Sequence, residues 1–190
     1  ALKDAGVAPV DDETIQRSVG WGERKLIEFF VPEKDVDKVH SIYRRYNKIA
    51  LKSNAKFLPN ARKVLDGLKE KGFRIALATN RPGYSTEIIL NRLKMRQCFD
   101  YILSADDIDR LKPDPEILFK VLKRLKVKPC EAVYVGDTVI DIKTGRNADV
   151  RVIAVTTGSN SLREISDESP FKIIDDVFMV LKIVDGINGI

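Results

Sequence analysis

From residue 61 onward, short apolar runs alternate with amphipathic stretches, and this alternation constrains the fold more than any other feature. The stretch "ARKVLDGLKEKG" (61–72) has helical spacing and stops at a glycine, and "FRIALAT" (73–79) is an apolar run of strand length. The pattern recurs with predicted helices at 84–95, 115–127 and 141–148 and predicted strands at 99–105, 131–137 and 150–156. Nearly continuous apolar strands separated by helices predict a parallel sheet covered by helices on both faces.

Residues 1–55 show a different pattern. Apolar residues there recur at helical spacing, and Pro32 and the Gly20-Trp21-Gly22 stretch interrupt them. No run in this part has the length and alternation of a strand. We therefore predict two domains, a small helical unit over residues 1–55 and an α/β core over residues 56–190.

Composition narrows the class of protein. Hydrophobic residues make up 44% of the chain, which is enough for a core, and no apolar run approaches the ~20 residues of a membrane span. The two cysteines, Cys98 and Cys130, match neither a disulfide framework nor a metal-binding spacing, so we expect a reducing, cytoplasmic location. The net charge is +5, but acids are interspersed with the basic residues, which favours a solvated surface over nucleic-acid binding. We expect neither a nucleic-acid nor a membrane partner.

Two predicted strands end in residues that suit a phosphorylated ligand. In parallel sheets, ligands bind beyond the carboxyl ends of the strands. Thr79 and Asn80 follow strand 73–79, where a hydroxyl and turn amides are able to hold phosphate oxygens. The alternative interpretation is an ordinary polar turn.

Strand 131–137 ends in Gly136-Asp137, with Asp141 one helical turn later. The glycine permits a close backbone approach to a ligand, and Asp137 offers a hard oxygen ligand to Mg²⁺ with Asp141 in support. Alternatively, Asp137 or Thr138 only caps the next helix.

The third feature is Lys112 in the stretch "LKPDPE" (111–116). Pro113 keeps Lys112 extended, so we expect its ammonium to stay at the rim of the sheet, where it is able to neutralise phosphate and carboxylate charge. Taken alone, such a lysine is an ordinary surface residue. Together, a hydroxyl donor, a fixed cation and metal-binding acids are the groups that stabilise a transferring phosphoryl group.

Three motifs resemble those of the haloacid dehalogenase superfamily, and most closely its phosphoglycolate phosphatase-like branch: Thr79-Asn80, Lys112-Pro113-Asp114-Pro115 and the stretch from Gly136 to Asp141. The resemblance implies a Rossmann-like core, a helical cap over residues 1–55, and Mg²⁺-dependent hydrolysis of a small phosphate monoester through an aspartyl-phosphate. It also implies that Thr79, Asn80 and Lys112 bind the phosphoryl group. By the same resemblance, Asp137 and Asp141 form the metal site.

The family's nucleophile lies in an Asp-x-Asp-Gly-Thr stretch after the first strand, and residues 1–190 contain no such stretch. In the family that strand occupies the middle of the sheet, between the strands predicted here at 73–79 and 131–137. We therefore expect the central strand to be missing from these residues and the nucleophile to lie upstream of residue 1. The alternatives are a catalytically silent binding module and a fragment that needs a partner strand.

Substrate choice is predicted to lie in the helical unit. Trp21, between two glycines, is a candidate for shielding the site from water, and Arg24 and Lys25 are candidates for contacting a substrate carboxylate. Alternatively, Trp21 packs between helices and the basic pair is solvated. Gly136-Asp137 favours a phosphatase over a phosphosugar mutase of this family, which typically has Glu-Asp there. We expect a small phosphorylated metabolite as substrate and a monomer or homodimer.

Overall fold

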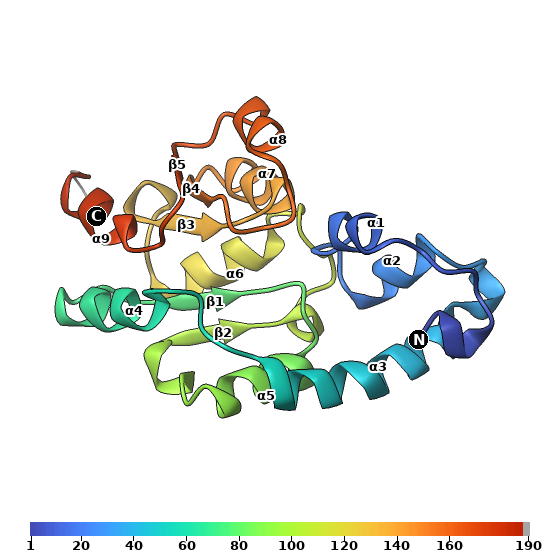
Figure 1. Cartoon of the computed structure of the whole chain (residues 1–190). Helices are drawn as coiled ribbons and strands as arrows, with labels where there is room; N and C mark the ends of the chain where they lie inside the picture. Colours follow the sequence, from blue (N-terminus) through green and yellow to red (C-terminus); the bar gives the residue numbers. More distant parts are fainter. Residues whose placement is uncertain (188–190) are drawn as a thin grey trace.

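The structure is a computed structural model that describes residues 1–187. It consists of a helical part built from the first 54 residues and an α/β part built from the rest (Figure 1). The helices are α1 (Asp12–Arg17), α2 (Glu23–Glu28), α3 (Glu33–Asn54), α4 (Ala61–Glu70), α5 (Gly83–Arg92), α6 (Glu116–Leu125), α7 (Val139–Asn147), α8 (Leu162–Asp167) and α9 (Met179–Asp185). The strands are β1 (Ala76–Ala78), β2 (Tyr101–Leu103), β3 (Val133–Gly136), β4 (Arg151–Val155) and β5 (Lys172–Ile174).

All strand pairs are parallel, as the alternation predicts. Strand β1 pairs with β2, with Leu77 opposite Ile102, and strands β3, β4 and β5 pair in that order, with Val135 opposite Ile153. Within residues 1–187, β1 and β3 do not pair with each other, so the strands form a two-stranded and a three-stranded sheet. The fold class is confirmed, and the predicted strands at 73–79 and 131–137 lie on separate sheets.

Side chains of β4 alternate between two helical layers. Ile153 and Val155 pack in one apolar cluster with residues of α4 and α9, whereas Val152 and Ala154 pack in another with residues of α7 and α8. This is the period-two pattern of a strand buried on both faces. The three-stranded sheet is therefore the rigid centre of the α/β part.

Helix α6 joins the two sheets. Its residues Ile117, Leu118 and Leu122 share one apolar cluster with Leu103 of β2, and Ala78 and Tyr134 of the two facing strands pack against that cluster. Figure 1 shows α6 behind the space that separates β1 from β3. Because α6 contacts both sheets, the two are held in one body without a direct ladder between them.

The helical part has an apolar cluster of its own, formed by Ile27, Val31, Val36 and Val39. The long helix α3 ends next to α5, where Arg92 donates to the carbonyls of Ser53 (2.7 Å) and Ala55 (2.9 Å). Arg92 thus satisfies carbonyls that a helix leaves free at its C-terminus. None of the helices within residues 1–187 is long and apolar enough to cross a bilayer.

Candidate functional site

Lys112 lies at the point where the two sheets approach each other. Its ammonium donates to Asp141 Oδ1 at 2.6 Å and to the Tyr134 hydroxyl at 2.9 Å, and it lies 3.5 Å from the carbonyl of Ala78. The side chain is only 10% exposed. The lysine therefore is not a surface residue; it is a buried cation between the carboxyl end of β1 and that of β3.

Both carboxylate oxygens of Asp141 accept hydrogen bonds. Besides Lys112, it accepts hydrogen bonds from the Tyr134 hydroxyl (2.7 Å) and from the Thr138 hydroxyl (2.7 Å) and amide (3.2 Å). Burial alone raises its pKa, but Lys112, Thr138 and Tyr134 outweigh burial and hold the pKa of Asp141 below its ordinary value. The Asp141 carboxylate therefore stays charged next to Lys112.

Thr138, not Asp137, caps helix α7. Its hydroxyl accepts from the amide of Asp141 at 3.2 Å, and Asp141 reaches back to the amide of Thr138 to complete a capping box. The capping alternative is thus correct for Thr138, and it leaves the carboxylate of Asp137 free of that role.

Asp137 contrasts with Asp141 in its surroundings. No side chain within residues 1–187 donates a hydrogen bond to its carboxylate, whose pKa is raised by burial and further by the nearby charge of Asp141. A partly buried carboxylate that lacks donors favours a proton or a cation. Asp137 is therefore the acid in this site that is best suited to a hard metal ion such as Mg²⁺.

Two glycines allow close packing at Asp137 and Asp141. A Cβ at Gly136 would lie 2.3 Å from the Cβ of Asp141, and one at Gly158 would lie 1.9 Å from the carbonyl oxygen of Asp137. The close approach that Gly136 permits is therefore to the side chain of Asp141. The sequence pattern predicted a close approach to a ligand, and the structure shows this intramolecular reason for the glycine.

Thr79 and Asn80 have different roles in the structure. The Thr79 hydroxyl accepts from the amide of Arg81 at 3.1 Å, which leaves its own proton free to donate. The buried Asn80 side chain bonds both the amide (2.9 Å) and the carbonyl (3.1 Å) of Lys112, and it donates to the carbonyl of Gly20 at 2.9 Å. Asn80 therefore positions the Lys112 backbone and a loop of the helical part.

That loop, Gly20-Trp21-Gly22, is called the glycine loop below. Gly20 and Gly22 have φ values of 111° and 98°, in the region that favours glycine. A Cβ at Gly22 would lie 2.8 Å from Leu111, the residue before Lys112. The glycine loop thus packs against the segment that carries the lysine, with Trp21 37% exposed beside it.

Arg24 and Lys25 do not approach this site. Arg24 pairs with Asp37 at 2.5 Å and with Glu33 at 3.2 Å, and Lys25 pairs with Glu28 at 3.2 Å. All of these acids belong to the helical part itself. The structure therefore brings Thr79, Asn80, Lys112, Asp137 and Asp141 together with the glycine loop, and it places the basic pair on the surface.

Sequence reasoning missed Tyr134. Its hydroxyl bridges Lys112 and Asp141, and burial followed by the charge of Asp141 raises the pKa of the phenol well above its ordinary value. The tyrosine therefore remains a donor at any ordinary pH. A signal was present, because Tyr134 is a polar-tipped residue two positions before Gly136 in an otherwise apolar strand.

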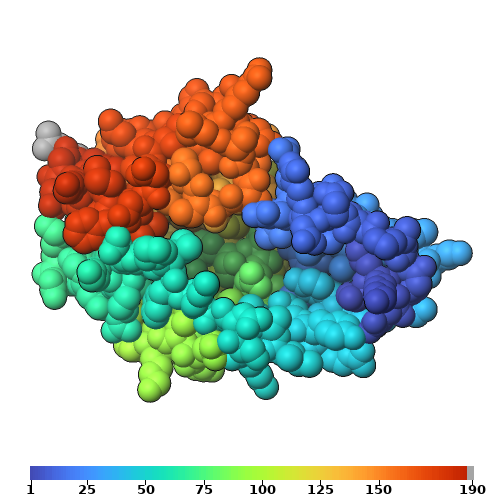
Figure 2. Space-filling view, viewed as in Figure 1, coloured from blue at the N-terminus to red at the C-terminus, as the bar shows by residue number. Residues whose placement is uncertain are grey.

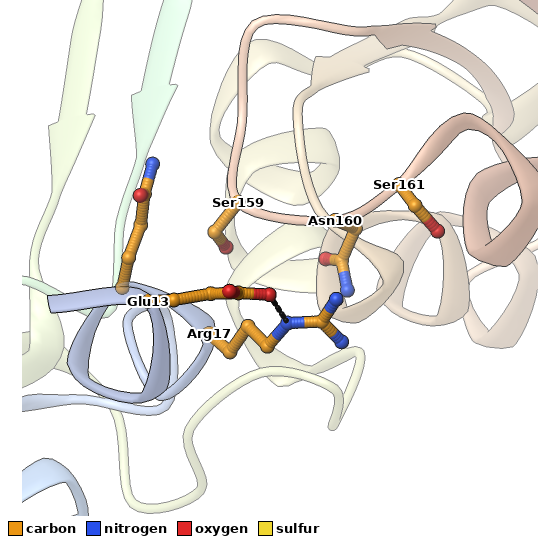
Figure 3. Close-up of a pocket in the computed structure, with 6 residues that line it drawn as sticks. Glu13, Arg17, Ser159, Asn160 and Ser161 are labelled. Atoms are coloured by element: carbon orange, nitrogen blue, oxygen red, sulfur yellow. Dashed lines mark hydrogen bonds and ion pairs between the residues drawn. The ribbon is translucent and has the colours of Figure 1, made fainter. Parts of the chain in front are cut away.

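A cavity of about 210 Å³ opens between α1 and the loop that precedes α8. It is lined by Glu13, Gln16, Arg17, Ser159, Asn160 and Ser161. Figure 3 shows Arg17 paired with Glu13 in front of this loop, at a distance of 3.3 Å between Nε and Oε1. In Figure 2 the surface is hollowed where the N-terminal helices (blue) meet the segment around residue 155 (orange). Ser159, which lines the cavity, directly follows Gly158, whose backbone packs closely against the Asp137 backbone.

Comparison with known proteins identifies related sequences. The family model described as "Haloacid dehalogenase-like hydrolase" matches residues 1–155, which include both the helical part and the site. The chain is 28% identical over 191 residues to a phosphoglycolate phosphatase of Nitrosospira multiformis, covering 96% of this chain and 84% of the relative. It is 34% identical over 184 residues to a phosphoglycolate phosphatase of Pseudomonas fluorescens, covering 93% and 68%.

Solved structures share the fold. A protein called a predicted phosphoglycolate phosphatase from Haemophilus somnus superposes with a TM-score of 0.88 at 23% identity, covering 96% of this chain and 86% of the other. A hydrolase of Streptococcus pneumoniae from the haloacid dehalogenase-like family gives a TM-score of 0.85 at 20% identity, with the same coverage of 96% and 86%. At these identities the likeness establishes the α/β fold.

Proposed function

Because the chain belongs to the haloacid dehalogenase-like hydrolase family, we propose that it is a magnesium-dependent phosphatase that hydrolyses a small phosphate monoester through an aspartyl-phosphate. The observation that carries this proposal is the buried Lys112 ammonium, held 2.6 Å from Asp141 at the carboxyl ends of β1 and β3. The relatives named phosphoglycolate phosphatase make phosphoglycolate the first substrate to test.

Each side chain of the site has a separate proposed role in binding the phosphoryl group or the metal ion. Lys112 would neutralise phosphoryl charge, and the Thr79 hydroxyl would donate to a phosphoryl oxygen, because it accepts from the amide of Arg81 and keeps its own proton free. Asp137 would hold Mg²⁺, since its carboxylate is partly buried and receives no side-chain hydrogen bond within residues 1–187. Asp141 would act in support, because its oxygens are taken by Lys112 and its neighbours. The metal ion, when bound, supplies charge that stabilises the phosphoryl group in the transition state.

The donor set is incomplete within residues 1–187. No cluster of three acidic, histidine or cysteine side chains there could hold a metal ion, and the facing edges of β1 and β3 have no partner strand. Unpaired strand edges are costly when they face a core. We therefore propose that a further strand, expected upstream of residue 1, inserts between β1 and β3 and delivers the nucleophilic aspartate and another metal ligand.

The proposed reaction has two displacements. An oxygen of the delivered aspartate forms a bond to phosphorus while the bond to the leaving oxygen breaks, and a neighbouring acid gives that oxygen its proton. Water then attacks the phosphorus and loses a proton to the same group. The bond between aspartate and phosphorus breaks, and inorganic phosphate leaves. Lys112 and Thr79 bind the phosphoryl oxygens throughout.

We also propose that residues 1–55 act as a cap over a core formed by residues 56–190, and that the glycine loop contacts the leaving group. The contact of Gly22 with Leu111 supports this role for Trp21. Arg24 and Lys25 would first have to leave their acidic partners, so Trp21 is the stronger candidate. The cytoplasmic location and the monomeric or homodimeric state stay predictions.

The test uses the natural protein, whose intact mass and N-terminal sequence are determined first and compared with the 21.5 kDa of residues 1–190. Release of phosphate from p-nitrophenyl phosphate and from phosphoglycolate is then measured with Mg²⁺, with a chelator, and after Mg²⁺ is restored. We expect turnover that the chelator abolishes and Mg²⁺ recovers, and that Lys112→Ala lowers by at least about 100-fold. A protein that has the additional strand but releases no phosphate would refute the proposal.

A further inference from the structure

A buried carboxylate lies at the joint between the helical part and the α/β part. Glu23, the first residue of α2, is 7% exposed. Its Oε1 accepts from the Tyr84 hydroxyl of α5 at 2.7 Å and from Asn47 of α3 at 3.0 Å. Its Oε2 lies 3.4 Å from His40 Nε2 and 3.6 Å from Arg44 Nε, both on α3. Of these partners, Tyr84 alone belongs to the α/β part.

Tyr84 is held in place from several sides. The guanidinium of Arg44 lies 4.5 Å and the ammonium of Lys48 lies 5.2 Å from the centre of its ring. Cations over an aromatic face are attracted to the ring. Burial raises the pKa of Tyr84, and the charge of Glu23 also raises it, so the hydroxyl remains a donor. Every buried polar side-chain atom within residues 1–187 has a hydrogen-bond partner, so this cluster is complete without a ligand.

The cluster is close to the glycine loop along the chain. Glu23 directly follows Gly22, and a Cβ at Gly22 would lie 3.7 Å from the carbonyl oxygen of Asn80. Tyr84 is the second residue of α5, the helix that follows Thr79 and Asn80. The Glu23–Tyr84 hydrogen bond therefore joins the loop on one side to the phosphate-binding turn on the other.

The other end of the joint is anchored independently. Arg92, in the last turn of α5, binds the carbonyls at the end of α3, far along both helices from Tyr84. Loss of the Tyr84 hydroxyl would leave that anchor intact and would leave Glu23 with Asn47, His40 and Arg44. The change would also remove the 3.3 Å hydrogen bond that Asn47 of α3 donates to the Tyr84 hydroxyl. It would thus act on Glu23 and on the part of α3 beside it, while Arg92 still holds the end of α3.

We propose that the hydrogen bond between Glu23 and Tyr84 is a latch that holds the glycine loop against Asn80 and the segment that carries Lys112. This makes Glu23 and Tyr84 positioning residues for the phosphatase reaction. The catalytic part of this inference rests on the proposed function. The latch itself does not, because it concerns a contact between two parts of the chain.

Trp21 provides a direct measurement of the latch, since it is the chain's single tryptophan and lies within the glycine loop. In the natural protein, Tyr84→Phe is expected to increase acrylamide quenching of Trp21 fluorescence. It is also expected to raise the KM for p-nitrophenyl phosphate about ten-fold with little change in kcat, because a lost hydrogen bond to a charged group shifts a closed state toward an open one by about that factor. The matched control is Tyr46→Phe, which removes a tyrosine hydroxyl that bonds Asp4 at 2.5 Å inside the helical part.

The outcomes separate the two proposals. Unchanged quenching in Tyr84→Phe, or an equal increase in Tyr46→Phe, would overturn the latch. Increased quenching with an unchanged KM would overturn the positioning role. Absence of turnover in the unmodified protein would count against the phosphatase proposal, and the quenching would still decide the latch. Should Tyr84→Phe fail to fold, Glu23→Met takes its place, because methionine has a similar length and removes the oxygen that accepts from Tyr84. It is expected to change quenching in the same direction, and an unchanged value would overturn the latch.

Discussion

Strands β3 and β4 are hydrogen-bonded neighbours with similarly apolar sequences, yet their environments differ sharply. Val135 of β3 lies opposite Ile153 of β4; the first is 40% exposed and the second is 0% exposed. Strand β4 has a partner on each side and helices on both faces, whereas β3, among the described strands, pairs with β4 alone. Position in the sheet, more than composition, therefore decides which apolar strand is buried.

The same contrast holds at the carboxyl ends of the strands. The open strands β1 and β3 are followed directly by Thr79 and Asp137, and the Lys112 ammonium lies 3.5 Å from the carbonyl of Ala78 at the end of β1. The closed strand β4 is followed by Thr156, whose amide continues the ladder to the carbonyl of Ile174 at 2.9 Å. The candidate site residues thus lie beside the strands that have an open edge, which agrees with the general placement of ligands in α/β proteins. The closed sheet supplies the rigid frame.

The largest effect is expected from changing the two strand ends. Asp137→Asn should lower Mg²⁺-dependent phosphate release by at least about 100-fold, because it removes the proposed metal ligand. Thr156→Val, at the end of the closed strand, should leave turnover within about two-fold, because no proposed ligand contacts it. Steady-state kinetics of the natural protein and the two variants measure both effects. Equal losses of turnover in the two variants would contradict the difference between open and closed strands.

A second prediction concerns the two strand centres. Ile153→Ala should cost about 2–5 kcal/mol in the free energy of unfolding, as a cavity in a closed core does. Val135→Ala should cost less than about 1 kcal/mol in residues 1–190, because its side chain is half exposed.

Urea unfolding of both variants tests this prediction, and it also tests the proposed additional strand. If that strand covers Val135 in the natural protein, Val135→Ala should become clearly more costly there than in residues 1–190. An identical small cost in both proteins would contradict a strand seated between β1 and β3.

The smallest effect is expected at the start of the open two-stranded sheet. Lys69, followed by the amide of Ile75, lowers the pKa of Asp100 below its ordinary value of 3.8. A carboxylate with a lowered pKa adds stability above its unfolded pKa, and that contribution is lost as the pH falls through the folded pKa. Asp100→Asn should therefore be less stable than the unmodified protein at pH 7, and the difference should shrink below about pH 3.8.

The measurement is the urea midpoint of each variant at pH 7 and at a pH below about 3.8. The control is Asp66→Asn, because Asp66 pairs with Arg62 on the exposed surface of the same helix, α4. A deficit of Asp100→Asn that does not change with pH would show that the charge of Asp100 does not secure β1 to β2.

Much of the fold was predictable because its signals are local. The predicted helices 61–72 and 115–127 correspond to α4 and α6, and the predicted strand 150–156 corresponds to β4. The predicted strand 73–79 is longer than β1, which spans Ala76–Ala78. An apolar run reports that a segment is buried or half buried, but a ladder extends only as far as a neighbouring strand accompanies it.

Most of the candidate site residues were also predictable from the sequence. Thr79 and Asp137 were predicted from their places after strands, Asp141 from its place one helical turn after Asp137, and Lys112 from the segment before Pro113. In the structure Lys112 lies between the carboxyl end of β1 and Asp141, at the facing ends of the two sheets. The use of Asn80 to bind the backbone of Lys112 was not predictable, nor was the surface pairing of Arg24. Both depend on segments that meet only after folding.

The sequence by itself determined the alternation of helices and strands, the helical character of residues 1–54 and the identity of the acids and the lysine, since each is written in a short stretch of residues. Tertiary structure alone decided that Tyr134 bridges Lys112 and Asp141 and that Glu23 binds Tyr84 across 61 positions. It also decided that no side chain in the described part of the chain donates to the Asp137 carboxylate, whereas several donate to Asp141. Periodicity specifies which face of an element is buried. The partner that each buried polar group finds depends on how whole elements pack, and a short stretch of sequence does not contain that information.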